Sequence, residues 1–345
     1  MTLVMLHDKS DRPKPALLWE DLTVKRMIVA AVALALLPLA AEAQSYPEQT
    51  ITMVVPFSAG GPTDTVARLV AESMSRDLGQ QVIVENVGGA GGTLGAGRVA
   101  KAEPDGYTVL LHHIGMATSA SLYRKLAYDP RNDFAPIGLV TDVPMTVVAR
   151  ADLEPADGKA LVDYIKANGD KISYANAGIG SASHLCGMML MNALQVQMTT
   201  IPYKGTGPAM TDLLGGQVDL LCDQTTNTTS HIKAGKVKAY AVTTPKRLAS
   251  LPDIPTTEEV GMGGLQVAVW HALYAPKGTP QEAIDRLSAS LKVALKDPKV
   301  IERFAELGTE PVAEDRATPE ALGAYLPAEI DRWKTIIDAA GVYAD

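Results

Sequence analysis

The sequence predicts an α/β protein of two domains that face each other across a cleft. Short apolar runs alternate with segments of helical spacing along its 345 residues, which is the pattern of parallel sheets with helices on both faces. No low-complexity linker interrupts the chain, so we expect hinge strands to join the domains. Two similar loops, at 58–64 and 177–184, each precede a helix, and both helix starts would line the cleft.

The N-terminal region is predicted to be an export signal. An apolar run from Met27 to Leu39 follows the basic residues Lys25 and Arg26 and precedes an Ala-x-Ala sequence at 41–43. The run is shorter than the roughly 20 residues that a membrane-spanning helix needs, and a buried core helix is the alternative. We therefore expect residues 1–43 to be removed and the mature protein to reach the periplasm in soluble form.

The segment before the basic pair is longer and more acidic than an ordinary signal peptide requires. Translation from Val24 would give a signal of ordinary length, whereas translation from Met1 would leave a doubtful extension. Both starts remain open. Cleavage after Ala43 gives the same mature chain in either case.

The elements of the first half follow from local signals. An apolar run at 51–56 predicts a strand, and apolar residues from Val66 to Leu78 recur with the helical period. Pro62 suits the first turn of that helix, and Gly79 ends it. The cycle then repeats as a strand at 82–85, a Gly-rich loop at 88–92, a helix at 93–102 and a strand at 107–111.

The second half continues the alternation and ends in helices. Strands are predicted at 172–176, 218–222 and 238–243, with a helix at 181–194. The C-terminal helices are predicted at 280–295, 298–307 and 319–340. This order favours helices packed against sheets rather than separate all-α and all-β domains.

Composition and charge exclude several functions. The chain is 47% hydrophobic and 20% charged, which is typical of globular rather than disordered proteins. With 31 basic and 39 acidic residues its net charge is −8, so it has no basic surplus to neutralise phosphates. Only 5% of its residues are aromatic, which leaves few platforms on which bases could stack. We expect no nucleic-acid partner.

The loop at 57–64 has the features of an anion site. Its Gly-Gly pair precedes a helix, whose first backbone N–H groups lack partners within the helix and lie at the positive end of the helix dipole. Hydroxyl side chains would add donors, and an ordinary tight turn is the alternative. The candidate ligand-binding residues here are Ser58, Ala59, Gly60, Gly61, Thr63 and Asp64.

The loop at 177–184 has the same character. Its glycines permit close approach of the backbone to a ligand, and its hydroxyl and imidazole groups can donate. For the histidine, a structural role at the helix start is the alternative. Two such loops facing each other would suit a dicarboxylate, with one carboxylate at each helix start. The candidates here are Gly178, Gly180, Ser181, Ser183 and His184.

Three other segments supply further candidates. The polar run at 223–229 follows a strand and would orient a ligand, or it is a connection with capping residues. His112 and His113 point to opposite faces of a strand, where one of them at the strand end would donate to a ligand. Lys204, after a tyrosine, is a counter-ion or a solvated side chain. The candidates from these segments are His113, Tyr203, Asp223, Gln224 and Thr225.

Sequence motifs for cofactors, metals and catalysis are absent. The Gly-rich loop fails as a dinucleotide motif, because Leu94 stands where a third glycine is needed. Neither a P-loop nor H-E-x-x-H occurs, and Gly180 begins the sequence Gly-Ser-Ala-Ser-His, which lacks the final glycine of G-x-S-x-G. We therefore expect no cofactor, no metal and no catalytic residue.

Cys186 and Cys222 are the only two cysteines. An exported protein meets an oxidising environment, and two cysteines permit a single pairing. One lies on the helix after the second loop and the other ends a strand before the polar run. The sequence therefore predicts a disulfide that ties two segments of one cleft wall together.

Several stretches resemble one known family. They include VPFSAGGPTDTVARLVAE, VIVENVGGAGGTLGAGRVAKAEPDGYTVLL and IPYKGTGPAMTDLLGGQVDLLCDQ, and they occur in this order. The mature chain, from about 46 to 342, is similar to the Bug (Bordetella uptake gene) family of extracytoplasmic solute receptors. These are also called tripartite tricarboxylate transporter substrate-binding proteins.

The resemblance implies a type II-like periplasmic binding-protein fold, in which two α/β domains joined by a hinge close on a ligand. Domain 1 would comprise 46–144 plus 268–345, and domain 2 would comprise 145–267. In the family, the loops that match 58–64 and 178–184 hold carboxylate groups through backbone amides and bridging waters. Family ligands are small carboxylates.

The resemblance also bears on ligand and partner. His113, Met116 and Trp270 would form a partly aromatic pocket, and we expect a carboxylate, with an aromatic dicarboxylate of the phthalate type as the finer prediction. The closed receptor, a monomer, would dock on a tripartite tricarboxylate permease. Two alternatives remain open: a periplasmic sensor that feeds a two-component kinase, and an enzyme acting on a small acid, against which the missing nucleophile–base motif argues.

Overall fold

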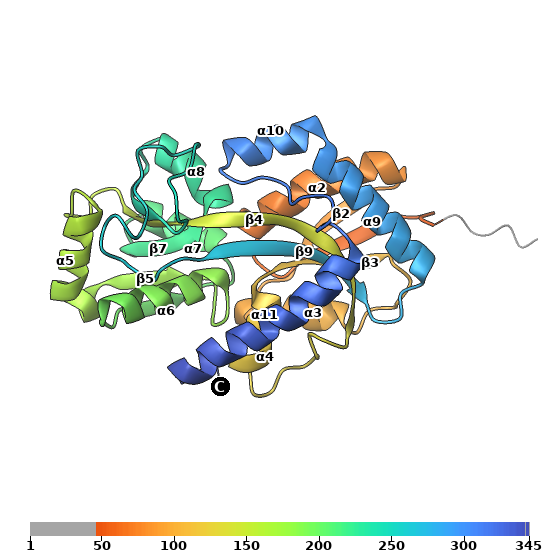
Figure 1. The fold of residues 1–345 in the computed structure, drawn as a ribbon, viewed down its shortest axis with the longest axis horizontal. Coiled ribbons are helices and arrows are strands. Elements are labelled where there is room, and N and C mark those ends of the chain that lie inside the picture. Colours follow the sequence, from red (N-terminus) through yellow and green to blue (C-terminus); the bar gives the residue numbers. More distant parts are fainter. Residues whose placement is uncertain (1–45, 342, 345) are drawn as a thin grey trace, which may run out of the picture. The chain divides into compact units, whose positions relative to one another are not determined.

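The computed structural model describes residues 46–341 and 343–344. The described residues form one compact unit, shown in Figure 1. The predicted signal peptide and both alternative translation starts lie outside the described residues. Among the described residues, no helix combines the length and apolar character needed to cross a membrane.

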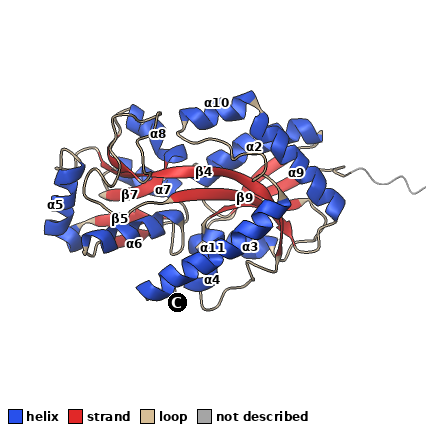
Figure 2. Cartoon of the chain, viewed as in Figure 1, coloured by secondary structure: helices blue, strands red, loops and turns tan. Residues whose placement is uncertain are grey.

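Nine strands of the described region form one continuous sheet, in the order β2-β1-β3-β9-β4-β7-β5-β6, with β8 paired to β4. Helices cover it on both sides, as Figure 2 shows. The predicted α/β class is confirmed. The strands are β1 (Ile51–Val55), β2 (Val82–Asn86), β3 (Thr108–His113), β4 (Phe134–Arg150), β5 (Ser173–Asn176), β6 (Thr199–Pro202), β7 (Leu220–Gln224), β8 (Val237–Val242) and β9 (Ala268–Pro276).

Two long strands connect the parallel parts of the sheet. The prediction of parallel pairing holds for β1 with β2 and β3, and for β5 with β6 and β7. Strands β4 and β9, which the sequence reasoning missed, pair antiparallel with their neighbours. They run side by side through the middle of Figure 1.

Strand β4 changes partners in its middle. Pro144 is its last residue paired to β9, opposite Ala268, and Met145 is its first residue paired to β7, opposite Gln224. Strand β4 therefore belongs to two groups of strands. The first group contains β1, β2, β3 and β9, and the second contains β5, β6, β7 and β8. The change falls where the sequence places a domain boundary, although the boundaries themselves remain a prediction.

Most predicted helices occur within a few residues of their expected ends. The helix expected at 93–102 already ends at Val99. The helices of the first group are α2 (Pro62–Leu78), α3 (Thr93–Val99), α4 (Gly115–Leu122), α9 (Gln281–Lys296), α10 (Pro298–Glu306) and α11 (Pro319–Ala340). Those of the second group are α5 (Gly158–Asn168), α6 (Ala182–Leu194), α7 (Thr206–Leu214) and α8 (Thr225–Lys233).

Helix α2 shows how the sequence positions a site element. Val66, Val70 and Met74 follow one another at four-residue spacing, and each is completely buried. Full burial of such a side chain stabilises the fold by roughly 1.5–3 kcal/mol. Gly79, in the left-handed conformation with φ 70°, ends the helix as predicted. The buried stripe fixes the direction in which the helix N-terminus points.

Helix α6 is tied to strand β7. The predicted disulfide between Cys186 and Cys222 is confirmed, with 6.1 Å between the two Cα atoms. The hydroxyl of the buried Tyr174 donates to the carbonyl of Ser183 at 2.5 Å. The disulfide to β7 and the hydrogen bond from Tyr174 of β5 together fix the position of α6 on the sheet.

Candidate functional site

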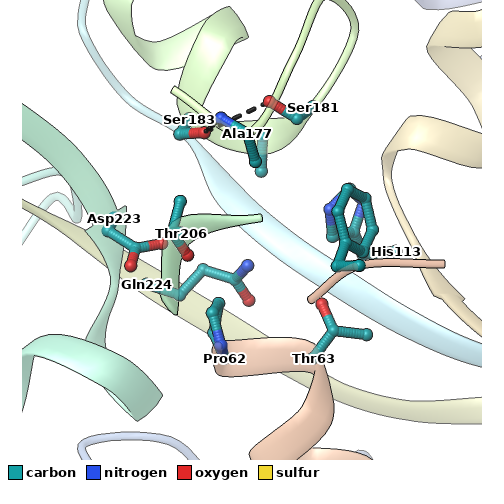
Figure 3. Close-up of a pocket in the computed structure, with 11 residues that line it drawn as sticks. Pro62, Thr63, His113, Ala177, Ser181, Ser183, Thr206, Asp223 and Gln224 are labelled. Atoms are coloured by element: carbon teal, nitrogen blue, oxygen red, sulfur yellow. Dashed lines mark hydrogen bonds between the residues drawn. The ribbon is translucent and has the colours of Figure 1, made fainter. Parts of the chain in front are cut away.

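Four of the described helices begin around one buried cavity. Pro62, Ala182 and Thr206 are the first residues of α2, α6 and α7, and Gln224 caps the start of α8. Unpaired N–H groups at a helix start carry partial positive charge, so the four starts together favour an anion. Figure 3 shows the cavity. Its lining is Phe57, Pro62, Thr63, His113, Ala177, Ser181, Ala182, Ser183, Thr206, Asp223 and Gln224.

The cavity is small. Its accessible volume is about 10 Å³, which is room for about one water molecule. Within the described part of the chain, none of the residues that line it is Lys or Arg. An anion in it would be held by helix starts and neutral donors, and the walls must separate before an organic acid enters.

Asp64 holds the first loop in shape. Its carboxylate accepts hydrogen bonds from the backbone N–H of Gly60 at 2.9 Å, from Asn86 at 2.9 Å and from Arg68 at 3.0 Å. Burial alone raises the pKa of Asp64, but these hydrogen bonds outweigh burial and leave the pKa below its ordinary value. The side chain is charged and fully engaged, and it does not line the cavity.

The second loop places two hydroxyl groups at the cavity. Ser181 caps α6 and accepts from the backbone N–H of His184 at 3.3 Å, while Ser183 accepts from that of Ala177 at 2.9 Å. The two serine oxygens lie 3.2 Å apart, so one hydroxyl donates to the other. One of the two hydroxyl protons is thus left to donate to a ligand.

His113 presents a neutral donor. Its Nδ1 accepts from the backbone N–H of Gly115 at 2.9 Å, which leaves the proton on Nε2. Burial, with the neighbouring His112 and His271, holds its pKa well below 6.5. The ring stacks on Phe57 at 4.5 Å between centroids.

Acceptor groups line the cavity at the end of β7. Asp223 is 1% exposed, and its Oδ2 accepts from Asn227 at 2.6 Å. Burial raises its pKa to about 6. The side-chain oxygen of Gln224 is buried without a hydrogen-bond partner, and the Thr206 hydroxyl lies beside Asp223, where it offsets part of the rise in pKa. This part of the wall can accept a donor from a ligand.

Comparison with known proteins identifies the family. Residues 66–342 match the family described as "Tripartite tricarboxylate transporter family receptor". The chain belongs to this family.

Relatives of the receptor cover almost its whole length. It is 56% identical over 92% of both chains to the "UPF0065 protein in the TAR-I ttuE-ttuC' intergenic region" of Agrobacterium vitis. It is 35% identical to "Protein BugT" of Bordetella pertussis, over 87% of this chain and 91% of that protein. The family is one of solute-binding receptors rather than of enzymes.

Solved structures confirm the periplasmic binding-protein fold of the receptor. "Structure of periplasmic binding protein BugD" is 57% identical with a TM-score of 0.85, over 86% of this chain and 99% of that one. MatC from Rhodopseudomonas palustris, described with bound malate, is 41% identical with a TM-score of 0.81, over 85% and 100% of the two chains. An R. palustris protein described with adipate is 32% identical with a TM-score of 0.81, over 86% and 99%.

The structure brings together six of the candidate residues of the receptor. The other candidates lie outside the cavity lining. The six are Thr63, His113, Ser181, Ser183, Asp223 and Gln224. Those outside are Ser58, Ala59, Gly60, Gly61, Asp64, Gly178, Gly180, His184, Tyr203, Thr225 and Trp270.

The outlying candidates have other partners. Ser58, Gly178 and Tyr203 line an outer groove of about 790 Å³, and the Tyr203 hydroxyl donates to Asp212 at 2.6 Å. The Thr225 hydroxyl donates to the carbonyl of Gly308 at 3.2 Å. The hydrogen bonds of Tyr203 and Thr225 stabilise the loops around the cavity.

Two members of the predicted aromatic pocket also lie elsewhere. Trp270 lines a separate cavity beside α11, where its indole N–H donates to Glu329 at 3.1 Å. Met116 is completely buried in the core and does not line the small cavity. Of the three residues expected in that pocket, the cavity contains His113.

Five lining residues were not named as candidates, although four of them lie within the two predicted loops at 57–64 and 177–184. For Thr206, the Gly205-Thr206-Gly207-Pro208 sequence before a helix was an available signal. The others contribute apolar atoms or backbone and carry no chemical signal. The five are Phe57, Pro62, Ala177, Ala182 and Thr206.

Among the described residues, no group of three or more His, Cys, Asp or Glu side chains could hold a metal ion. His112 and His113 lie with their ring centroids 5.1 Å apart, and their Nδ1 atoms accept backbone hydrogen bonds. The polar groups of the cavity therefore fit an organic anion rather than a metal.

Proposed function

We propose that this protein is a periplasmic receptor that captures a small carboxylate for a permease of the tripartite tricarboxylate type. The observation that carries the proposal is the convergence of four helix starts, the neutral donor His113 and the Ser181–Ser183 pair on one buried cavity. Such groups bind a carboxylate without a cationic side chain. The export signal and disulfide support the periplasm as its location, and we expect a monomer.

Capture would proceed by closure of the two loops on the ligand. Ser58 donates its backbone N–H to the carbonyl of Lys204 at 3.1 Å, and Thr118 donates to that of Gly180 at 3.0 Å. Tyr123 donates to the carbonyl of Ile179 at 2.8 Å. These contacts connect predicted domain 1 with predicted domain 2, which supports a closed arrangement, and a ligand that bridges both domains would shift the population towards it.

The relatives support an aliphatic acid as the ligand. MatC is described with malate and a second relative with adipate. An aromatic dicarboxylate of the phthalate type is the second candidate. It is favoured by the stacked rings of Phe57 and His113, which offer a flat face to an aromatic ligand.

Ser181→Ala tests the site by calorimetric titration with malate, succinate, adipate and phthalate. Loss of a hydrogen bond to a charged group costs about 1.5–3 kcal/mol, so we expect roughly 10- to 150-fold weaker binding of whichever acids the wild type binds. Thr318→Ala is the matched control, because Thr318 caps α11 far from the cavity as Ser181 caps α6.

The control should lose stability, by about 1 kcal/mol, but no affinity. Equal affinity of wild type and Ser181→Ala for every acid that binds would contradict the site. Failure of all four acids to bind the wild-type protein would contradict the proposed ligand class.

A further inference from the structure

The polar lining of the cavity is divided by hydrogen-bonding character. His113 and the serine pair of α6 offer protons to the cavity, while the Thr63 hydroxyl pairs with Nε2 of His271 at 3.4 Å. Asp223 and Gln224 occupy the end of β7 and offer oxygen atoms, as Figure 3 shows. A plain dicarboxylate uses donors alone. The acceptors therefore need a separate explanation.

Asp223 is an unusual group in a cavity that favours anions. It is 1% exposed, and among the described residues no ion pair includes it. Its neighbours are the Asn227 amide, the backbone N–H of Gln224 and the hydroxyl of Thr206, all neutral. A buried carboxyl group without a cation costs free energy, and a ligand that donates to it recovers part of that cost.

Gln224 supplies a second acceptor beside it. The side chain is 2% exposed and lines the cavity, and its Oε1 has no hydrogen-bond partner. Buried polar atoms are paired in nearly all folded proteins, and an exception at a binding cavity points to a partner that the ligand brings. The unpartnered Gln224 oxygen thus lies next to a carboxylate that is already bonded to Asn227 but has only neutral neighbours.

We propose that Asp223 and Gln224 select carboxylates that carry a hydrogen-bond donor, a hydroxyl or an ammonium group, over unsubstituted acids. The inference rests on the proposed function of the cavity and specifies its ligand further. An unsubstituted acid brings no donor, so it leaves the Gln224 oxygen unpaired and Asp223 with its neutral neighbours alone. A site built to bind a donor rejects the analogue that lacks it.

Succinate, malate and aspartate test this directly, because the three differ only in hydrogen, hydroxyl or ammonium at one carbon. In titration calorimetry, the wild type should bind malate or aspartate at least about tenfold more tightly than succinate, because succinate lacks one hydrogen bond to a charged group. A preference for malate would identify a neutral donor, and one for aspartate a charged donor. Either supports the proposal.

Asp223→Asn and Gln224→Met keep side-chain size. The first removes the charge and one of the two acceptor oxygens, and the second removes the amide oxygen. Each should reduce the preference to less than about threefold. Ser183→Ala, on the donor side, should instead weaken all three acids and preserve their order. If Asp223→Asn fails to fold, Gln224→Met gives the same test.

The two proposals fail in different ways. Equal affinity of the wild type for all three acids, or a preference that survives both substitutions, would overturn the acceptor wall and leave the carboxylate receptor standing. If succinate, malate, aspartate, adipate and phthalate all fail to bind the wild type, both proposals are wrong.

Discussion

Asp64 and Asp223 are both buried acidic side chains beside helix starts, but their surroundings give them opposite roles. Asp64 accepts from Arg68, Asn86 and a backbone N–H, which hold its pKa low and make it a charged brace for the first loop. Asp223 has neutral neighbours, and burial raises its pKa to about 6. Residue type alone predicted both as ligand contacts, because the sequence does not show which partners surround a carboxylate.

The raised pKa of Asp223 predicts a pH-dependent difference in stability. The folded state favours the protonated carboxyl, so its stabilising contribution is complete below the unfolded pKa of about 4 and is lost as pH rises through about 6. Asp223→Asn does not titrate. Between pH 4 and 7 the free energy of unfolding of wild type should therefore fall relative to the variant, by up to about 3 kcal/mol.

Urea denaturation of both proteins at pH 4.5, 5.5, 6.5 and 7 measures this difference. Asp285→Asn, at an exposed position on α9, is the control and should follow the wild type at every pH. Parallel curves for wild type and Asp223→Asn would show that burial does not raise the pKa of Asp223.

At the scale of elements, the sequence predicted strands and helices with local signals and missed those fixed by tertiary contacts. Helix α2 has a buried stripe and a terminal glycine, both visible in the sequence. Strand β4 is buried along most of its length, so its apolar residues do not alternate. Helix α8 is rich in Thr, which disfavours helices, and hydroxyls of Thr225 and Thr229 bond the distant Gly308 and Leu307 carbonyls.

Two glycines inside helices should respond oppositely to alanine. In Gly187→Ala the new Cβ would lie 2.2 Å from the ring of buried Tyr174, which should destabilise the fold by about 1–3 kcal/mol or more. In Gly323→Ala on α11 the nearest atom would be 3.6 Å away, so helix propensity should stabilise it by up to about 1 kcal/mol. Thermal unfolding of both variants measures the difference, and equal melting temperatures would contradict the packing of α6 on β5.

At the scale of the molecule, two glycine-rich loops approach closely, and the proposed closure would depend on that approach. A Cβ at Gly91 would lie 1.9 Å from the carbonyl oxygen of Ile179. Gly91→Ala should therefore oppose the closed state more than the open one. A clash of about 1–3 kcal/mol would weaken binding roughly 5- to 150-fold.

Gly264→Ala is the matched control for this variant. Both glycines have positive φ, 61° and 83°, but nothing lies within 4 Å of a Cβ at Gly264. Calorimetry with whichever of succinate, malate and aspartate binds the wild type most tightly should show weakened binding in Gly91→Ala but not in Gly264→Ala. Small-angle scattering with that ligand should give Gly91→Ala a larger radius of gyration than the wild type. Normal affinity in Gly91→Ala would exclude this approach from the closing motion.

The absence of Lys and Arg from the cavity lining, within the described residues, has a consequence for ionic strength. A receptor that holds its anion through ion pairs loses affinity as salt screens them. Here the donors are neutral and enclosed, while the molecule as a whole carries a net charge of −8 that repels an approaching anion. Added salt weakens that repulsion and leaves the buried hydrogen bonds intact. As the salinity around the cell rises, the ligand should therefore associate faster with this receptor, and its affinity should not fall.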